Sequence, residues 1–268
     1  MKTFEDHFGF SSTPFTREIP VDKRLDFDFL ATQTDLLEDT VKRRMSAVLL
    51  APAGTGKSSV LRSLEDRLPK ARYRTSYFKL GNLSGRDLCR EIAHAVGARV
   101  VSNFPALIRA VQERFEQDCG TDGLKPVLIF DDAHLLRQEG LELIKVLTSF
   151  AFDSRLVVSV VLAGHPSLRE KLYRPEVEDV RQRLAHCGEL RLLSRDETMA
   201  YIEHRLTIAG SRSVPFDKGA LEALYEMSRG NMRAVDNLAL KALGKAAAAG
   251  VKTVGQQHVV QGGRELCL

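Results

Sequence analysis

Short apolar runs alternate with longer amphipathic segments through the first two thirds of the chain. Three runs, at residues 47–50, 127–130 and 156–163, are almost continuously apolar, which is typical of strands buried on both faces of a parallel sheet. A fourth segment, 73–80, alternates between apolar and polar side chains, as a strand with one covered face does. The pattern therefore predicts four strands.

Segments with helical periodicity separate these strands. They cover residues 32–44, 60–68, 87–96, 104–115 and 135–150. Strands that alternate with helices form βαβ units, whose right-handed crossovers place helices on both faces of a parallel sheet. We therefore expect an α/β fold for this part of the chain.

The pattern changes at Arg195, because apolar positions beyond it recur only at helical spacing. Three helices are predicted, at 196–209 with Ser194 as N-cap, at 217–227 and at 232–249. Since no strand pattern interrupts them, the parallel sheet is expected to be followed by a small all-helical lid domain.

The predicted boundaries divide the chain into four parts. These are an N-terminal arm with a linker helix (1–45), the α/β core (46–190), the helical lid (191–250) and a C-terminal tail (251–268). Scattered aromatic residues without helical spacing mark the arm, and we expect their rings to pack on the chain's own core or on a neighbouring subunit. No structure is assigned to the short segment 256–261 of the tail.

Composition and charge narrow the class of protein. Of the 268 residues, 44% are hydrophobic and 28% charged, as in a folded globular protein, and the formal net charge of +4 permits a nucleic-acid partner without requiring one. The four cysteines form no C-x-x-C pair, so we expect reduced thiols and no zinc site. No apolar run is long enough to span a bilayer, which predicts a cytoplasmic protein without a membrane partner.

A glycine-containing loop follows the first apolar run. Its sequence, APAGTGKS from Ala51 to Ser58, fits the P-loop pattern with alanine at the first glycine position. Gly54 and Gly56 allow the backbone N–H groups to point at a phosphate, and Lys57 can reach the β- and γ-phosphates of ATP. The residues predicted to contact ATP are Pro52, Ala53, Gly54, Thr55, Gly56, Lys57, Ser58 and Ser59.

Two acidic residues, Asp131 and Asp132, stand directly after the run 127–130. Open α/β sheets bind ligands at the carboxyl ends of their strands, so these carboxylates are expected beside the P-loop. We predict that Ser58 and Asp131 hold Mg²⁺, Asp131 through the water shell of the ion. Asp132 would orient or deprotonate the attacking water. The alternative is that both acids cap the following helix.

These motifs together resemble the AAA+ ATPases of the ExeA-like group, which also includes the transposition ATPases TnsC and TniB and, more distantly, MuB. The resemblance covers most of the chain. The segments that carry it are 8–10, 14–15, 51–58, 131–136, 162–168, 181–184 and 230–233. It implies the AAA+ version of the P-loop fold, with ATP and Mg²⁺ as ligands.

The resemblance implies roles for three residues beyond the two acids. His165 corresponds to sensor 1, which contacts the γ-phosphate or the water, and Arg233 to sensor 2, which closes the lid onto the γ-phosphate. Arg183, with Arg181 as the alternate, corresponds to the arginine finger that reaches the ATP of a neighbouring subunit. Such a finger needs an oligomer, a ring or a helical filament, so ATP binding and self-assembly become coupled.

Structural alternatives stay open at these three positions. His165 could simply cap the strand end, and the arginines could lie on solvated helix surfaces. At Asp132 the family usually has glutamate, and the shorter aspartate could place the carboxylate about an ångström too far back, at a cost on the order of a hundredfold in rate. We therefore expect slow hydrolysis, which suits a switch better than a motor.

Three uses of ATP fit the resemblance. The first is a transposition regulator that assembles on duplex DNA without sequence preference and recruits a transposase or another recombination protein. The second is secretion or envelope assembly, as in ExeA, and the third is regulation through protein partners alone. ExeA-like relatives continue into a transmembrane segment and a cell-wall-binding domain, and because this chain ends soon after the lid, we favour the DNA role.

A basic stretch between the second and third strands is the candidate DNA surface. The corresponding stretch faces DNA in the transposition ATPases that the chain resembles, and phosphate contacts there would be independent of sequence. Its residues are Lys79, Arg86, Arg90 and Arg99. The alternative is an ordinary solvated helix face.

Overall fold

The computed structural model describes residues 3–16, 19, 23–79 and 81–266, and these residues form two compact units. One unit comprises residues 28–52 and 57–190 and contains a β-sheet. The other comprises the described residues up to Phe27, residues 53–56 and the chain from Arg191 onward, and it is mainly helical. Each unit is described by itself below.

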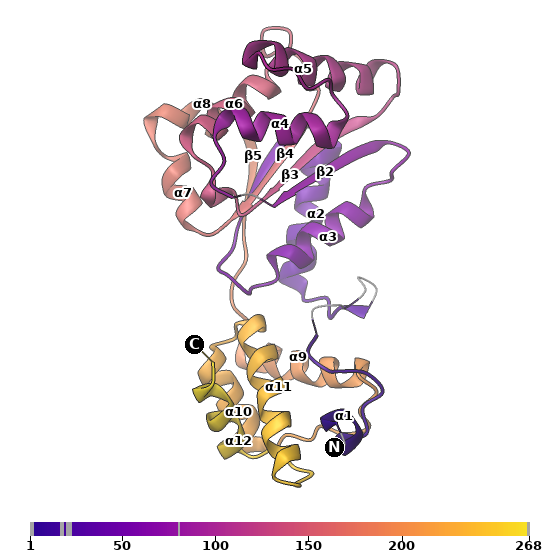
Figure 1. Cartoon of the computed structure of the whole chain (residues 1–268), viewed down its shortest axis with the longest axis vertical. Helices are drawn as coiled ribbons and strands as arrows, with labels where there is room; N and C mark the ends of the chain where they lie inside the picture. Colours follow the sequence, from indigo (N-terminus) through magenta and orange to yellow (C-terminus); the bar gives the residue numbers. More distant parts are fainter. Residues whose placement is uncertain (1–2, 17–18, 20–22, 80, 267–268) are drawn as a thin grey trace. The chain divides into compact units, whose positions relative to one another are not determined.

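A parallel five-stranded sheet forms the centre of the first unit (Figure 1). The strands are β1 (Ser46–Leu50), β2 (Tyr73–Lys79), β3 (Lys125–Asp131), β4 (Ser159–Gly164) and β5 (Leu184–Glu189). Their spatial order is β2-β3-β4-β1-β5, with every neighbouring pair parallel. The three inner strands are almost wholly buried because helices cover both of their faces. This confirms the predicted α/β fold.

The fifth strand was not predicted. β5 lies at the edge of the sheet and pairs only with β1, and most of its side chains are partly or fully exposed. An edge strand needs no continuous apolar run, so the segment from Leu184 to Glu189 lacked the pattern that marked the inner strands.

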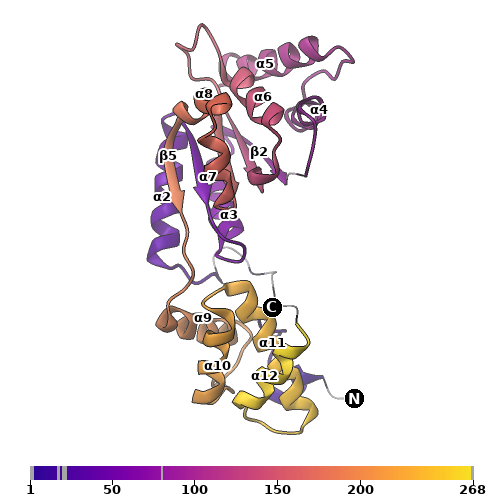
Figure 2. The same cartoon turned by 90° about the vertical axis from the view of Figure 1, so that its left-hand side faces the viewer.

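Helices form a layer on each face of the sheet (Figures 1 and 2). On one face α2 (Asp28–Lys42) packs beside α3 (Lys57–Arg67). The other face carries α4 (Gly85–Val96), α5 (Phe104–Gly120) and α6 (Gln138–Thr148). Between this layer and the sheet lies a continuous apolar core, in which the rings of Phe78 and Phe130 stack at a centroid distance of 5.0 Å. Burial of this core is the main force that holds the strand ends in place.

Short helical turns connect β3 and β4 to the elements that follow. The helix predicted over 135–150 is shorter in the structure. A 3₁₀ turn forms at Ala133–Leu135, and α6 begins only at Gln138. After α6, three successive residues, Ala151 to Asp153, have left-handed backbone conformations, so β4 begins later than predicted, at Ser159. The segments between β4 and β5 are α7 (Ser167–Leu172), a 3₁₀ turn (Pro175–Val177) and α8 (Glu178–Gln182).

The second unit is a helical bundle. Its helices are α1 (Phe4–Phe8), α9 (Arg195–Ile208), α10 (Lys218–Ser228), α11 (Met232–Ala248) and α12 (Gln256–Arg264). Ser194 caps α9 as predicted, by accepting a hydrogen bond from the backbone N–H of Glu197. The segment left unassigned in the tail is α12, which packs on α10 and α11.

The N-terminal arm packs within this helical unit. Residues Phe4–Phe8 form the short helix α1, which lies against α11 and which the sequence pattern did not predict. The ring of Phe15 meets that of Phe216 edge to face at 6.4 Å, and the buried Arg205 donates to the backbone carbonyl of Thr16. The ring of Phe15 therefore serves the chain's own packing.

Candidate functional site

The loop after β1 has the backbone geometry that the P-loop pattern predicts. Gly54 and Gly56 have φ values of 78° and 92°, in the left-handed region that glycine adopts without strain. The N–H group of Ala51 donates to the carbonyl of Gly164 at 2.9 Å, which fixes the start of the loop at the carboxyl end of β4. α3 begins directly after the loop, at Lys57, so the positive end of a helix dipole lies at this edge of the sheet.

Lys57 lies between the two predicted acids. Its ammonium nitrogen is 3.0 Å from Oδ1 of Asp132 and 3.3 Å from Oδ1 of Asp131. The side chains of Lys57 and Asp131 are largely shielded from water, being only 13% and 5% exposed. Three residues that the sequence assigned to one site are thus brought together by the ends of β1 and β3.

The carboxylate of Asp131 accepts hydrogen bonds on both oxygens. Oδ1 accepts from the backbone N–H of Asp132 at 2.8 Å, and Oδ2 accepts from the hydroxyl of Tyr77 at 2.8 Å. Partial burial and the hydrogen bond to Asp131 both raise the pKa of Tyr77 above its ordinary value, so the phenol remains a donor. Sequence reasoning missed Tyr77, because only the register of β2 against β3 places it here.

Asp132 is held in the left-handed region, at φ 56° and ψ 34°. Its side chain makes no capping hydrogen bond to the 3₁₀ turn that follows, so the proposal that it serves as a helix cap is wrong. Burial raises the pKa of Asp132, but the hydrogen bond and charge of Lys57 outweigh this and hold the pKa below its ordinary value. The group is therefore a carboxylate at neutral pH.

His165 comes directly after β4, at the same edge of the sheet. It is exposed, and its backbone N–H donates to Nδ1 of His134 at 3.3 Å, with the two rings 5.9 Å apart. Burial lowers the pKa of His134, which favours the neutral ring that this contact requires. The loops after β3 and β4 therefore touch. His134 is a further neighbour of the acids that the sequence pattern did not single out.

Arg183 lies away from Lys57 and the acids. It directly precedes β5, so it stands at the amino end of the sheet, whereas the acids stand at the carboxyl end. Its guanidinium donates to Asp153 at 2.6 Å and to the hydroxyl of Ser149 at 3.2 Å. Arg183 therefore cannot reach the acids of its own chain.

Arg181 and Arg233 are the other two arginines predicted from the resemblance. Arg181 pairs with Glu178 at 3.1 Å and lies over the ring of Tyr173 at 4.7 Å. Arg233 is exposed in the first turn of α11, in the helical unit. Neither position by itself points to a ligand.

The four basic residues proposed for DNA differ in their surroundings. Lys79 is exposed opposite Asp131 in the β2–β3 register, and its charge contributes to the lowered pKa of Asp132. Arg86 donates to the carbonyl of Ser102 at 2.7 Å, and Arg90 lies 3.5 Å from Asp87. Arg99 is exposed just after α4. Arg86 and Arg90 lie one turn apart on α4 and share one face of that helix.

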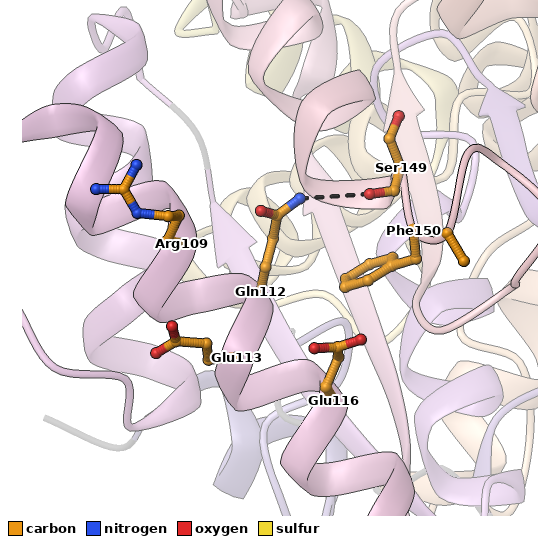
Figure 3. A pocket seen from close by; sticks show the side chains of 7 residues that line it. Arg109, Gln112, Glu113, Glu116, Ser149 and Phe150 are labelled. Carbon is orange, nitrogen blue, oxygen red and sulfur yellow. Dashed lines mark hydrogen bonds between the residues drawn. The ribbon is translucent and has the colours of Figure 1, made fainter.

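A shallow pocket lies beside α5, at the amino end of the sheet (Figure 3). Gln112 donates from one wall to the carbonyl of Ser149 on the other, and Glu113 and Glu116 face the same opening. These contacts tie α5 to the end of α6. The pocket is thus separate from the Lys57–Asp131–Asp132 site.

The fold and this site define a class of protein. A parallel sheet, a glycine loop that leads into α3 and an acid pair at the end of β3 are the parts of a P-loop nucleoside-triphosphatase of the AAA+ fold. Residues 40–172 match the family described as "AAA domain".

One curated relative and several solved structures resemble the chain. The relative is "General secretion pathway protein A" of Aeromonas hydrophila, 28% identical over 198 residues. The match covers 73% of this chain and 36% of that protein, so the chain spans about a third of the relative's length.

Within the part of the chain that the structure describes, none of the helices has the length and apolar character of a membrane span.

The similar structures share the fold. Cdc6p of Pyrobaculum aerophilum has a TM-score of 0.74 at 18% identity, covering 94% of this chain and 70% of its own. The Aeropyrum pernix ORC1 protein in complex with DNA has a TM-score of 0.69 at 17% identity, covering 92% and 68%. RuvB of Thermotoga maritima, a Holliday junction branch migration motor, has a TM-score of 0.58 at 17% identity, covering 94% and 73%. At these identities the likeness concerns the fold alone.

Proposed function

We propose that the chain is a Mg²⁺-dependent ATPase that works as an ATP-controlled switch. The observation that carries this proposal is the position of Lys57, at the first residue of α3 and paired with both acids at the end of β3, Asp131 and Asp132. An ammonium group held there can exchange its carboxylate partners for the β- and γ-phosphates of ATP. The left-handed Gly54 and Gly56 leave the loop backbone free to bind a phosphate.

The residues at the site also fit Mg²⁺. The ion prefers oxygen ligands and takes few of them from the protein in phosphate sites, and Ser58 and Asp131 offer a hydroxyl and a carboxyl group. When bound, Mg²⁺ neutralises charge on the phosphates. The backbone from Pro52 to Ser59, including Ala53 and Thr55, would contact the nucleotide, and Arg233 would contact its γ-phosphate.

Asp132 is the proposed general base. Because its pKa is held below the ordinary value, Asp132 is deprotonated at neutral pH, but it is a weak base while Lys57 is paired with it. Transfer of Lys57 to the phosphates would weaken that pairing and strengthen the base. His165, at the same edge of the sheet, would contact the attacking water or the γ-phosphate. The short side chain of Asp132 supports slow turnover.

We further propose that Arg183 completes the ATP site of a second copy. It lies at the opposite end of the sheet from its own chain's acids, so it can complete an ATP site only in another copy. Assembly into a ring or filament would then be coupled to ATP binding, and Arg183 would exchange Asp153 for the γ-phosphate.

The use proposed for this switch is regulation of transposition. ATP would favour an assembly on duplex DNA that recruits a transposase or another recombination protein. The exposed Lys79, Arg86 and Arg99, with the half-buried Arg90, support a phosphate-binding surface. The specific observation for a second function, in secretion or envelope assembly, is the similarity to General secretion pathway protein A.

Duplex-DNA binding measured with ATP, with ADP and without nucleotide distinguishes these functions. We expect ATP-dependent binding, and rings or filaments on the DNA by negative-stain imaging. Lys57→Ala is the control and should bind DNA equally weakly in all three conditions. If the parent protein fails to bind DNA even at low salt with ATP, the transposition role is wrong and the secretion role gains support.

A further inference from the structure

Tyr77 occupies a distinct place beside the acids. It lies on the edge strand β2, opposite Ile129 in the β2–β3 register, while Lys79 lies opposite Asp131. Tyr77 and Asp131 are therefore diagonal neighbours on one face of the sheet, a spacing that a long aromatic side chain can bridge. The hydroxyl reaches Oδ2 of Asp131 at 2.8 Å, although the two residues are 54 positions apart.

This hydrogen bond adds little to strand pairing. β2 and β3 are already paired along seven consecutive positions, from Tyr73–Lys125 to Lys79–Asp131. Tyr77 is also 47% exposed, so it is a minor part of the core. The hydrogen bond is better explained by its effect on the orientation of the Asp131 carboxylate than by a contribution to the stability of the sheet.

The two hydrogen bonds on Asp131 fix the rotation of its carboxylate. The N–H of Asp132 holds Oδ1, and the phenol of Tyr77 holds Oδ2 from the opposite side. Oδ2 keeps a second lone pair that can accept from water, whereas Oδ1 is also approached by the ammonium of Lys57 at 3.3 Å. A carboxylate that binds an ion through its water shell depends on orientation, because the water positions are set by the octahedral geometry of Mg²⁺.

We propose that Tyr77 is a positioning residue for the metal end of the site. Its hydroxyl orients the Asp131 carboxylate toward the water shell of Mg²⁺ that accompanies the nucleotide. The inference rests on the proposed ATPase function, and it adds a residue from the edge strand to the P-loop and the acid pair. Groups that orient metal-binding carboxylates influence metal affinity without touching the ion.

Tyr77→Phe tests this role, since it removes the hydroxyl and keeps the ring. The measurement is the affinity for a fluorescent ATP analogue as free Mg²⁺ is varied, with a series in excess EDTA. We expect the Mg²⁺ concentration at half-saturation to rise about five- to tenfold, at the low end for such orienting groups. Affinity in EDTA and the melting temperature should match the parent. Tyr73→Phe, at the other end of β2, is the matched control and should leave the Mg²⁺ dependence unchanged.

Three results would overturn the proposal in distinguishable ways. If the parent shows Mg²⁺-dependent binding and Tyr77→Phe shows the same dependence, Tyr77 has no positioning role and the ATPase proposal stands. An equal loss of affinity with and without Mg²⁺ would show a merely structural contact. If the parent itself binds no nucleotide, both proposals fail together.

Discussion

The ammonium group of Lys57 lies 3.0 Å from a carboxylate oxygen of Asp132, although the two residues are 75 positions apart in the chain. Asp131 shares the same ammonium at 3.3 Å. Two neighbouring carboxylates would repel each other without this cation, and a free lysine beside the loop would be poorly ordered. In the proposed function, the two acids hold the ammonium of Lys57 until the phosphates of ATP compete for it.

Asp132→Asn should abolish hydrolysis and spare binding. The amide keeps the size of the side chain but cannot accept the proton of the attacking water, so we expect turnover to fall about a hundredfold or more. ATP affinity should stay within about threefold of the parent, because Lys57 loses only one of two partners. Steady-state phosphate release measures the expected loss of turnover, and equilibrium nucleotide binding measures the expected ATP affinity.

Asp132→Glu is the companion variant. If the short carboxylate limits the rate, the longer one should raise turnover, by up to about a hundredfold. The left-handed backbone at this position suits aspartate better than glutamate, so a small loss of melting temperature is expected. Unchanged turnover would mean that another residue or step sets the rate.

Mixing two inactive variants tests whether Arg183 acts in trans. Arg183→Ala should bind ATP normally and lose about a thousandfold or more of its hydrolysis, as removal of an arginine finger does. Lys57→Ala should be inactive for a different reason, since it keeps Arg183 but has lost its own ATP site. When the two are mixed, some interfaces combine an intact site with an intact arginine, and hydrolysis should return.

Arg181→Ala is the control for this experiment. It removes a neighbouring arginine that pairs with Glu178, and it should hydrolyse ATP like the parent. If Arg183→Ala hydrolyses like the parent while Arg181→Ala does not, the finger is Arg181. If neither substitution changes the rate, no finger is supplied from this segment.

The inner sheet and the Lys57–acid site could be predicted from the sequence because their signals are local. Apolar runs marked β1, β3 and β4, and the loop and acids stand at fixed offsets from those runs. The rule that parallel strands bring their carboxyl ends to one edge then placed Lys57 near Asp131.

The remaining features depend on pairing that no local pattern records. β5 is a strand through its single neighbour β1, although its sequence includes exposed polar residues such as Glu189. Tyr77 meets Asp131 through a strand register, and Arg183 meets Asp153 through a loop of left-handed residues. Register and loop conformation are tertiary properties, so the partners of Tyr77 and Arg183 could not be inferred from spacing.

Glu197→Gln should make the stability of the helical unit less dependent on pH. Hydrogen bonds from Arg191 at 2.6 and 2.7 Å, with a bond from the N–H of Ser194, lower the pKa of Glu197 from 4.5 to about 2. A lowered carboxyl pKa stabilises the fold above pH 4.5, and this stabilisation is lost as pH falls toward 2. Because the pair is solvent-exposed, its contribution is about 1 kcal/mol.

Melting curves between pH 7 and pH 2 check this expectation. The variant should melt a few degrees below the parent at pH 7, and the difference should shrink as the pH drops below 4.5. Glu203→Gln, an exposed carboxylate on the same helix, is the matched control. A difference that stays constant down to pH 2 would contradict the assigned pKa.

Removing the two arginine charges of α4 tests whether this helix belongs to the proposed DNA-binding surface. The double substitution Arg86→Ala and Arg90→Ala should weaken ATP-dependent binding to duplexes of unrelated sequence alike. It should also reduce the slope of log affinity against log salt by about 1 for every phosphate that the protein no longer neutralises. Lys70→Ala, an exposed lysine before the amino end of β2, is the control. Equal affinity and slope in the double variant would place the DNA elsewhere.

The most direct test of the central claim is equilibrium binding of Mg²⁺·ATP to the parent chain and to Lys57→Ala. The parent should bind, and the variant should lose about a hundredfold or more in affinity, because it lacks the ammonium that passes from the two acids to the phosphates. Normal binding by Lys57→Ala would show that the nucleotide site lies elsewhere and would contradict the account of this edge of the sheet.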